Sequence, residues 1–98
     1  MKLVIEDDAK QDLRDCYHFY EETEPGAGNY FFDNIQSELH SLTNIAGIHR
    51  KRFGFHFYAS KRFPHGIYYL ADDDCLRIAA IIDSRRSPQN IRKILRTR

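Results

Sequence analysis

The sequence predicts an α+β fold in which a helical hairpin packs on a mainly antiparallel sheet. Two observations predict it: apolar residues recur at helical spacing through the first half of the chain, and they recur at strand spacing in the second half. A length of 98 residues indicates one domain over 1–98 with a single modest core. The expected order is βααβββα: strand, helix, helix, three strands and a short helix.

The first half of the chain contains the predicted helical hairpin. Residues 2–5 are apolar and β-branched, which favours a short strand. Asp7 or Asp8 then caps a helix that ends near Thr23, and Pro25 and Gly26 break the chain. A second helix is expected over 27–45, with Gly47 beyond its end. Both helices carry an apolar stripe. The stripe residues are Ala9, Leu13, Cys16, Tyr17 and Tyr20 in the first helix, and Phe31, Phe32, Ile35, Leu39 and Leu42 in the second.

The second half predicts a three-stranded meander and a last helix. Alternating aromatic residues indicate a strand over 53–58, and apolar runs indicate strands over 62–70 and 76–82. The continuous apolar run of 76–82 predicts burial on both faces. Pro64 favours an edge position, or a bulge, near the start of its strand. Ser87 followed by Pro88 is typical of a helix start.

The cysteine count and hydropathy predict a cytoplasmic protein with no membrane partner. Cys16 and Cys75 are too few for a disulfide scaffold and are expected to be free packing thiols in a reducing compartment. The chain has no recognisable secretory signal and no apolar stretch of the length that spans a bilayer. The histidines match no established metal-ligand spacing, and no glycine-rich phosphate loop occurs, so neither a metal nor a cofactor is predicted.

The charges are divided between the two halves of the chain. Residues 1–49 hold three Lys and Arg against ten acids, a net −7, whereas residues 50–98 hold twelve against four, a net +8. Such asymmetry indicates surfaces with different partners. The alternative is that the two halves neutralise each other across the fold. Because the overall charge is only +1, the composition gives little support to direct binding of nucleic acid.

The basic residues of the second half gather where strands start and end. In an antiparallel meander the end of the last strand returns to the start of the strand before it, so Arg62 and Arg85 are expected to be neighbours. Two adjacent guanidinium groups repel unless an anion lies between them, and phosphate or carboxylate suits their geometry. The alternative is that Asp83, or an acid of the first two helices, pairs with them. The whole predicted target- or anion-binding set is Arg52, Lys61, Arg62, Arg85, Arg86 and Arg92.

His65 is the one candidate acid or base near this predicted rim. It follows Arg62 by three residues, and histidine exchanges protons near neutral pH. The alternative is a turn histidine beside Pro64 with no chemical role.

Three segments together resemble the RelE/ParE superfamily of toxins from type II toxin–antitoxin systems. They are Arg62-Phe63-Pro64-His65-Gly66-Ile67-Tyr68-Tyr69, the strand from Leu76 to Asp83, and Ser84-Arg85-Arg86-Ser87-Pro88. Ala9, Asp12, Leu13 and Tyr20 fit the usual opening helix of the superfamily, and Phe32, Ile35, Leu39 and Leu42 fit its second helix. The resemblance covers nearly the whole chain and implies the fold already predicted.

The resemblance implies two possible activities. RelE-like members cleave mRNA on the ribosome, and ParE-like members, associated with plasmid stabilisation, inhibit DNA gyrase. A nuclease would use Arg62, His65 and Arg85, yet no tyrosine follows Tyr69 and no residue is a convincing base. The residues of the motifs resemble ParE-like members more than RelE-like ones, which implies a gyrase-binding toxin that is not an enzyme. A module that has lost toxicity and only binds a partner is the third alternative.

The resemblance also implies a cognate antitoxin. Its bound segment is expected to cover the toxin as a helix or strand, in an apolar groove beside the helical hairpin that suits an acidic amphipathic peptide. The residues predicted to contact it are Leu13, Tyr17, Tyr20, Phe31 and Ile35.

Overall fold

The computed structural model describes all residues from 1 to 98 and has the predicted fold class. In chain order its elements are β1 (Lys2–Ile5), α1 (Asp7–Thr23), α2 (Ala27–Leu42), β2 (Lys51–Arg52), β3 (Phe55–Ala59), β4 (His65–Ala71), β5 (Cys75–Asp83) and α3 (Pro88–Leu95). The strands form one sheet in the order β1-β5-β4-β3-β2. β1 runs parallel to β5, and every other pair is antiparallel.

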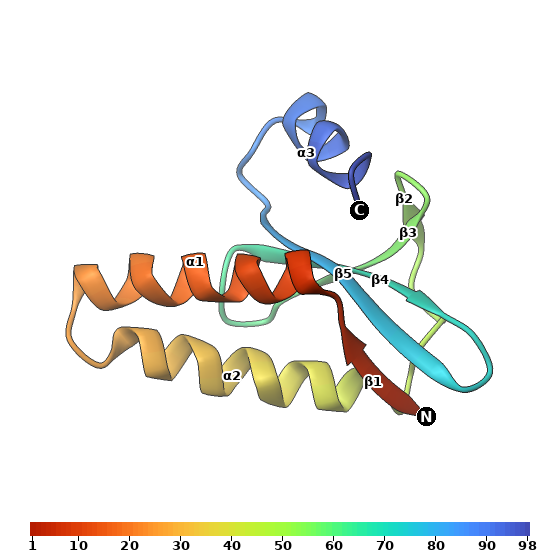
Figure 1. Ribbon diagram of the computed structural model, residues 1–98, viewed down its shortest axis with the longest axis horizontal. Coiled ribbons are helices and arrows are strands. Elements are labelled where there is room, and N and C mark those ends of the chain that lie inside the picture. The colour runs from red at the N-terminus through yellow and green to blue at the C-terminus, as the bar shows by residue number, and fades with distance from the viewer.

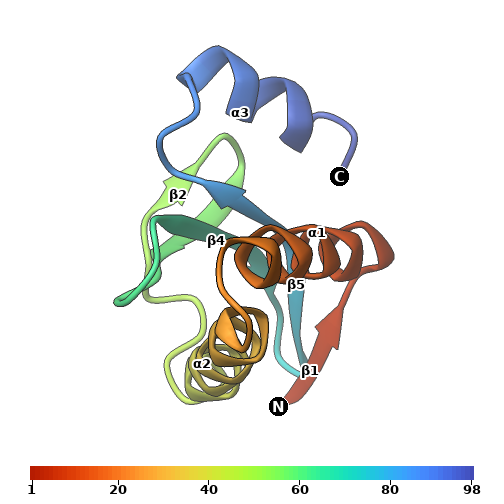
Figure 2. The same ribbon diagram turned by 90° about the vertical axis from the view of Figure 1, so that its left-hand side faces the viewer.

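The helical hairpin covers one face of the sheet and α3 covers part of the other (Figure 1, Figure 2). α1 and α2 bury their apolar stripes against β4 and β5 in the larger core, which contains Ala9, Leu13, Phe31, Ile35, Leu39, Leu42, Ile67, Tyr69, Leu76, Ile78 and Ile81. On the opposite face, Ile91 and Leu95 of α3 pack on Tyr68, Ala80 and Ile82. β5 is therefore buried on both faces, as its continuous apolar run predicts.

The segment from the end of α2 to the start of β3 departs from the sequence prediction at two points. α2 ends at Leu42 and not at residue 45, and a series of turns leads to Gly47. The expected strand over 53–58 begins only at Phe55, because Phe53 and Gly54 form a tight turn with φ of 55° and 86°. Positive φ at both residues suits a two-residue β-hairpin, and that hairpin adds β2 to the four predicted strands.

Two turn signals act as boundaries. Pro64 lies just before β4, which is an inner strand that starts at His65 and not at residue 62, and the only irregularity of its pairing with β5 falls between Tyr68 and Tyr69. Ser87 caps α3 as predicted, because its side-chain oxygen accepts a hydrogen bond from the Asn90 backbone N–H at 3.2 Å. None of the three helices combines the length and the hydropathy that a membrane span requires.

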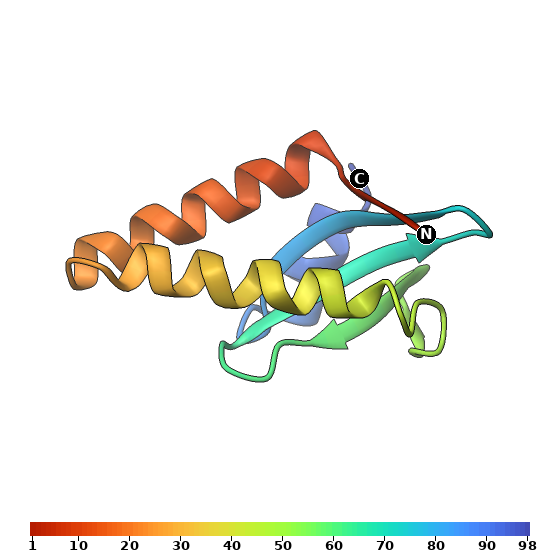
Figure 3. The same cartoon turned by 90° about the horizontal axis from the view of Figure 1, so that it is seen from below.

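Viewed from below, α1 and α2 run side by side along the sheet (Figure 3). Their close approach depends on Gly28, because a Cβ atom there would lie 2.8 Å from the Tyr17 backbone oxygen. Glu21 of α1 accepts hydrogen bonds from the backbone N–H groups of Gly26 and Gly28 and fixes the turn between the helices. Tyr17 and Tyr20 are thus held at defined places beside the start of α2.

Candidate functional site

The predicted basic rim lies where β4 begins and β5 ends. His65 pairs with Asp83 in the strand register, and the Ser84 backbone N–H donates to the Pro64 oxygen at 2.9 Å. The antiparallel return expected from the sequence is therefore present. A cavity of about 370 Å³ opens beside this edge between α1, β5 and α3. Its charged and polar lining residues are Asp12, Asp15, Cys16, Tyr20, His65, Asp83, Arg85, Arg86 and Arg98.

Arg85 is paired with Asp83 within the chain. Its Nε and Nη2 atoms lie 3.0 and 2.7 Å from the two carboxylate oxygens, and its backbone N–H also donates to Asp83 at 2.8 Å. The hydrogen bond from the Arg85 side chain lowers the pKa of Asp83 to about 2 and raises the pKa of Arg85. The sequence left open the alternative that Asp83 pairs with an arginine of the rim. The structure confirms this alternative for Arg85.

Arg62 has a different partner. It lies in the loop between β3 and β4, and its Nη1 atom donates to the Tyr30 hydroxyl at 3.1 Å. No hydrogen bond or ion pair joins Arg62 to Arg85 or to a group that both share. Each arginine is held by its own neighbour, so the structure does not assemble the shared pair expected from the sequence.

His65 is buried behind the rim. Its side chain is 6% exposed, its Nε2 atom lies 3.1 Å from the Tyr20 hydroxyl, and its Nδ1 atom has no hydrogen-bond partner. Burial lowers the pKa of His65. The negative charge of Asp83 raises this pKa in part, and the positive charge of Arg85 lowers it further. The imidazole is therefore neutral at pH 7 and is enclosed by Tyr20 and Phe31, with ring centroids at 6.0 and 5.4 Å.

The remaining predicted basic residues fall into separate places. Lys61 and Arg86 are exposed, and only Arg86 lines the cavity beside Arg85. Arg52 and Arg92 lie together at the tip of the β2–β3 hairpin, where each guanidinium stacks on the ring of Phe53. The predicted set is thus divided between the β4–β5 edge and the hairpin tip.

Three of the predicted antitoxin contacts are core residues. Phe31 and Ile35 have no exposed surface and Leu13 is 4% exposed, because all three pack in the larger core between the hairpin and the sheet. The prediction of Phe31 and Ile35 as surface contacts is therefore wrong, because a helical stripe of large apolar residues usually faces the core. Leu13 reaches the surface only at its edge, where it contributes to the lining of the groove beside α1. Tyr17 and Tyr20 are half-buried and keep accessible surface.

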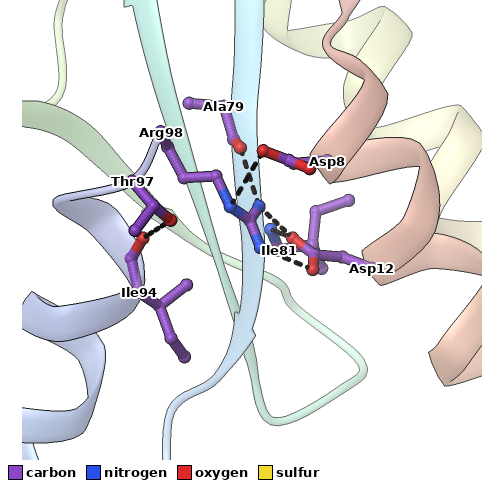
Figure 4. Close-up of polar contacts among 7 residues, drawn as sticks. All are labelled: Asp8, Asp12, Ala79, Ile81, Ile94, Thr97 and Arg98. Carbon is purple, nitrogen blue, oxygen red and sulfur yellow. Dashed lines mark hydrogen bonds and ion pairs between the residues drawn. The ribbon is translucent and has the colours of Figure 1, made fainter.

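Sequence reasoning missed the best-connected ion pair of the molecule, which joins Arg98 to Asp12 (Figure 4). Arg98 also donates to the Ala79 carbonyl at 3.0 Å and lies 3.8 Å from Asp8, while Asp12 accepts from the Ile81 backbone N–H at 3.0 Å. A signal was available, since Asp12 lies three residues after Ala9 and four before Cys16, on the buried side of α1. This pair, together with Arg77 and Glu6, shows that charges of the two halves do neutralise each other in part.

Both cysteines are free. Cys75 is buried at the start of β5, and Cys16 is half-buried beside the cavity. Burial, with Asp12 and Asp15 nearby, raises the pKa of Cys16 to about 12. Neither thiol is therefore an activated nucleophile, and both serve as packing groups.

The comparisons with known proteins agree with this arrangement. The family model described as the ParE toxin of the type II toxin–antitoxin system, parDE, matches residues 3–88. A solved structure described as the chromosomal ParDE TA system from P. aeruginosa superposes with a TM-score of 0.76 at 20% identity, covering 85% of this chain and 95% of that one. No curated protein sequence matches the chain. The family match over residues 3–88 and the shared fold together establish that the chain belongs to the ParE family of toxins.

Proposed function

We propose that the chain is the toxin of a type II toxin–antitoxin pair and that it acts by binding and inhibiting DNA gyrase. The observation that carries the proposal is the ParE family match over residues 3–88. We further propose that 1–98 works as one domain in the cytoplasm, and that the exposed basic residues of the β4–β5 edge, Arg62, Arg85 and Arg86, contact the target.

The chemistry of the rim supports binding over RNA cleavage. Cleavage through a 2′-hydroxyl needs a base, an acid and a group that stabilises the phosphorane. His65 is buried and hydrogen-bonded to Tyr20, and Arg85 is paired with Asp83. These residues supply a structured, partly neutralised surface rather than a set of groups poised around a reactive phosphate.

The test is a supercoiling assay with purified gyrase and the purified chain. We expect inhibition of negative supercoiling that increases with the concentration of the chain and that weakens in Arg62→Glu/Arg86→Glu. Lys2→Glu/Arg77→Glu is the matched control, because it makes the same charge change on β1 and β5. Unimpaired supercoiling at saturating toxin, together with position-specific cuts in translated mRNA by primer extension, would replace this proposal with the RelE-like one.

We also propose that a cognate antitoxin neutralises the chain by binding the groove between α1 and α2. The groove has a volume of about 640 Å³, and Leu13, Tyr17 and Phe32 contribute its apolar lining. Lys10, Arg14 and His18 follow one another at four-residue spacing along α1 and line the same groove. An apolar floor with a basic wall fits an acidic amphipathic segment.

Isothermal titration with the protein encoded beside this chain tests the antitoxin site. Lys10→Glu/Arg14→Glu is expected to weaken binding by at least about tenfold, because it places acids opposite acids. Lys2→Glu/Arg77→Glu, the control, should bind as the wild type does. Equal affinity of the wild type, Lys10→Glu/Arg14→Glu and the control for the antitoxin would mean that the antitoxin does not bind this groove.

A further inference from the structure

An alternating stack of arginine and aromatic side chains joins α3 to the tip of the β2–β3 hairpin. The Arg92 guanidinium lies 5.3 Å from the centre of the Phe53 ring, and the Arg52 guanidinium lies 5.5 Å from Phe53 and 5.2 Å from Phe57. The two elements adjoin in both side views (Figure 1, Figure 2). Stacking fixes the plane of each guanidinium while its N–H edges stay free to donate.

Four more cations lie near this stack in the sequence. Arg50 and Lys51 precede Arg52, and Lys93 and Arg96 follow Arg92 at the C-terminal end of α3. All six basic residues are exposed, and we call them the basic face. None of them forms an ion pair, whereas Arg77, Arg85 and Arg98 all do.

The basic face is also remote in sequence from any compensating acid. Residues 39–71 contain no Asp or Glu, and neither do residues 84–98, so the hairpin and α3 carry positive charge only. The overall charge of +1 hides this, because the acids lie mainly on α1 and α2. Six cations without counterions on two adjoining elements create a strongly positive local potential.

The composition of the face favours a polyanion over a protein partner. Protein interfaces are anchored by buried apolar and aromatic side chains. None of the exposed large apolar residues of this chain belongs to β2, β3 or α3: they are Met1, Phe19, Tyr30, Phe32, Ile45, Ile48 and Leu70. The rings of Phe53 and Phe57 are themselves stacked against guanidinium groups and are not free to anchor a partner.

We propose that the basic face binds the phosphodiester backbone of a nucleic acid without reading its sequence. Arg52 and Arg92 donate to phosphate oxygens from their stacked positions, and the four neighbouring cations add charge. The contact is independent of gyrase and goes beyond the proposed function.

Fluorescence anisotropy with the purified chain and a labelled duplex DNA, over a series of salt concentrations, tests the proposal. We expect log Kd to rise with log salt with a slope of about 3, and Arg52→Gln/Arg92→Gln to lower that slope by about 2 and to weaken binding about tenfold at low salt. Lys2→Gln/Arg77→Gln removes the same charge from β1 and β5 and should bind as the wild type does. The single variants, each lowering the slope by about 1, serve if the double variant does not fold.

Two further arms identify the ligand. Labelled duplex RNA and single-stranded RNA distinguish the sources of phosphodiester, and binding to either one supports the proposal. Absence of binding to every nucleic acid at low salt overturns it, as does an equal loss of affinity in the control variant. Displacement of the DNA by polyglutamate at the same charge concentration also overturns it and assigns the face to an acidic protein.

Discussion

Arg98 and Asp12, which are 86 residues apart in sequence, form a bidentate ion pair with distances of 2.7 and 2.9 Å. Both side chains are largely buried, with exposures of 12% and 16%. The pair connects the chain beyond α3 to α1, and both partners also hydrogen-bond to the backbone of β5. It therefore holds together the two layers that lie on opposite faces of the sheet.

Breaking this pair should destabilise the fold strongly. Arg98→Gln leaves the Asp12 carboxylate without its main partner, and a largely buried charge that loses its partner costs about 2–4 kcal/mol of unfolding free energy. Urea denaturation measures the change. The half-exposed pair of Arg77 with Glu6 is the control: Arg77→Gln should cost less than about 1 kcal/mol. Equal costs for the two variants would mean that Arg98 contributes no more than a surface ion pair.

Gly28→Ala should destabilise the helical hairpin. The added methyl group meets the Tyr17 backbone oxygen at 2.8 Å, and a main-chain atom cannot move aside without shifting α1 against α2. We expect a loss of about 1–3 kcal/mol in urea denaturation, the usual range for overpacking. Asn29→Ala, one residue further along α2 and exposed, should be neutral within about 0.5 kcal/mol. A Gly28→Ala protein as stable as the wild type would show that the helices are not in tight contact.

Acidification should destabilise the protein through His65. Its pKa is lower in the folded state than the value of about 6.5 expected for the unfolded chain, so the unfolded chain takes up the proton first as the pH falls. The contribution to stability is complete above about pH 6.5 and is lost as the pH falls through the folded pKa of His65. The slope of unfolding free energy between about pH 7 and about pH 5 should be smaller in His65→Gln than in the wild type. An identical slope would mean that burial of His65 has no effect on its titration.

Asp83 should act in a separate and more acidic window. Its pKa of about 2 in the folded state lies below the ordinary value near 3.8, so the contribution of its bond to Arg85 is present above that value and is lost towards pH 2. Asp83→Asn should reduce the loss of stability in this acidic range. Thermal melts at a series of acidic pH values measure it, and a wild-type profile in the variant would contradict the assignment.

The thiols should be inert in the folded protein. Cys75 is buried, so a reagent in solution does not reach it. The pKa of Cys16 is raised to about 12, so almost none of the Cys16 thiol is ionised at neutral pH. A colorimetric disulfide reagent should label both cysteines within minutes in denaturant and neither on that time scale in buffer. Fast labelling of Cys16 in the native protein would show that the cavity beside it opens.

The architecture is predictable from the sequence because buried apolar residues recur at the spacing of the helix or strand that carries them. The stripes of α1 and α2, the apolar run of β5 and the Ser87–Pro88 start of α3 are local signals, and each agrees with the structure. β2 was not predictable from the pattern, since Lys51 and Arg52 are charged and exposed and show no alternation. The same limit applies to the Phe53 turn, where a non-glycine residue adopts a positive φ.

The side-chain partners at the site were only partly predictable. Antiparallel pairing correctly predicts that the end of β5 lies beside the start of β4, because strand order alone fixes that neighbourhood. The pairing of Arg85 with Asp83 depends on side-chain rotamers, and the hydrogen bond from Arg62 to Tyr30 depends also on the position of α2. The prediction that Phe31 and Ile35 lie at a surface is wrong because a stripe pattern does not show which side of a helical hairpin meets the sheet.

Plasmid topology and transcript ends, measured in the same cells after this chain is induced, test the proposed inhibition of gyrase most directly. We expect loss of plasmid negative supercoiling or linear plasmid, with transcript ends unchanged, and recovery when the antitoxin is expressed with the chain. Intact supercoiling accompanied by new, translation-dependent transcript ends would contradict it.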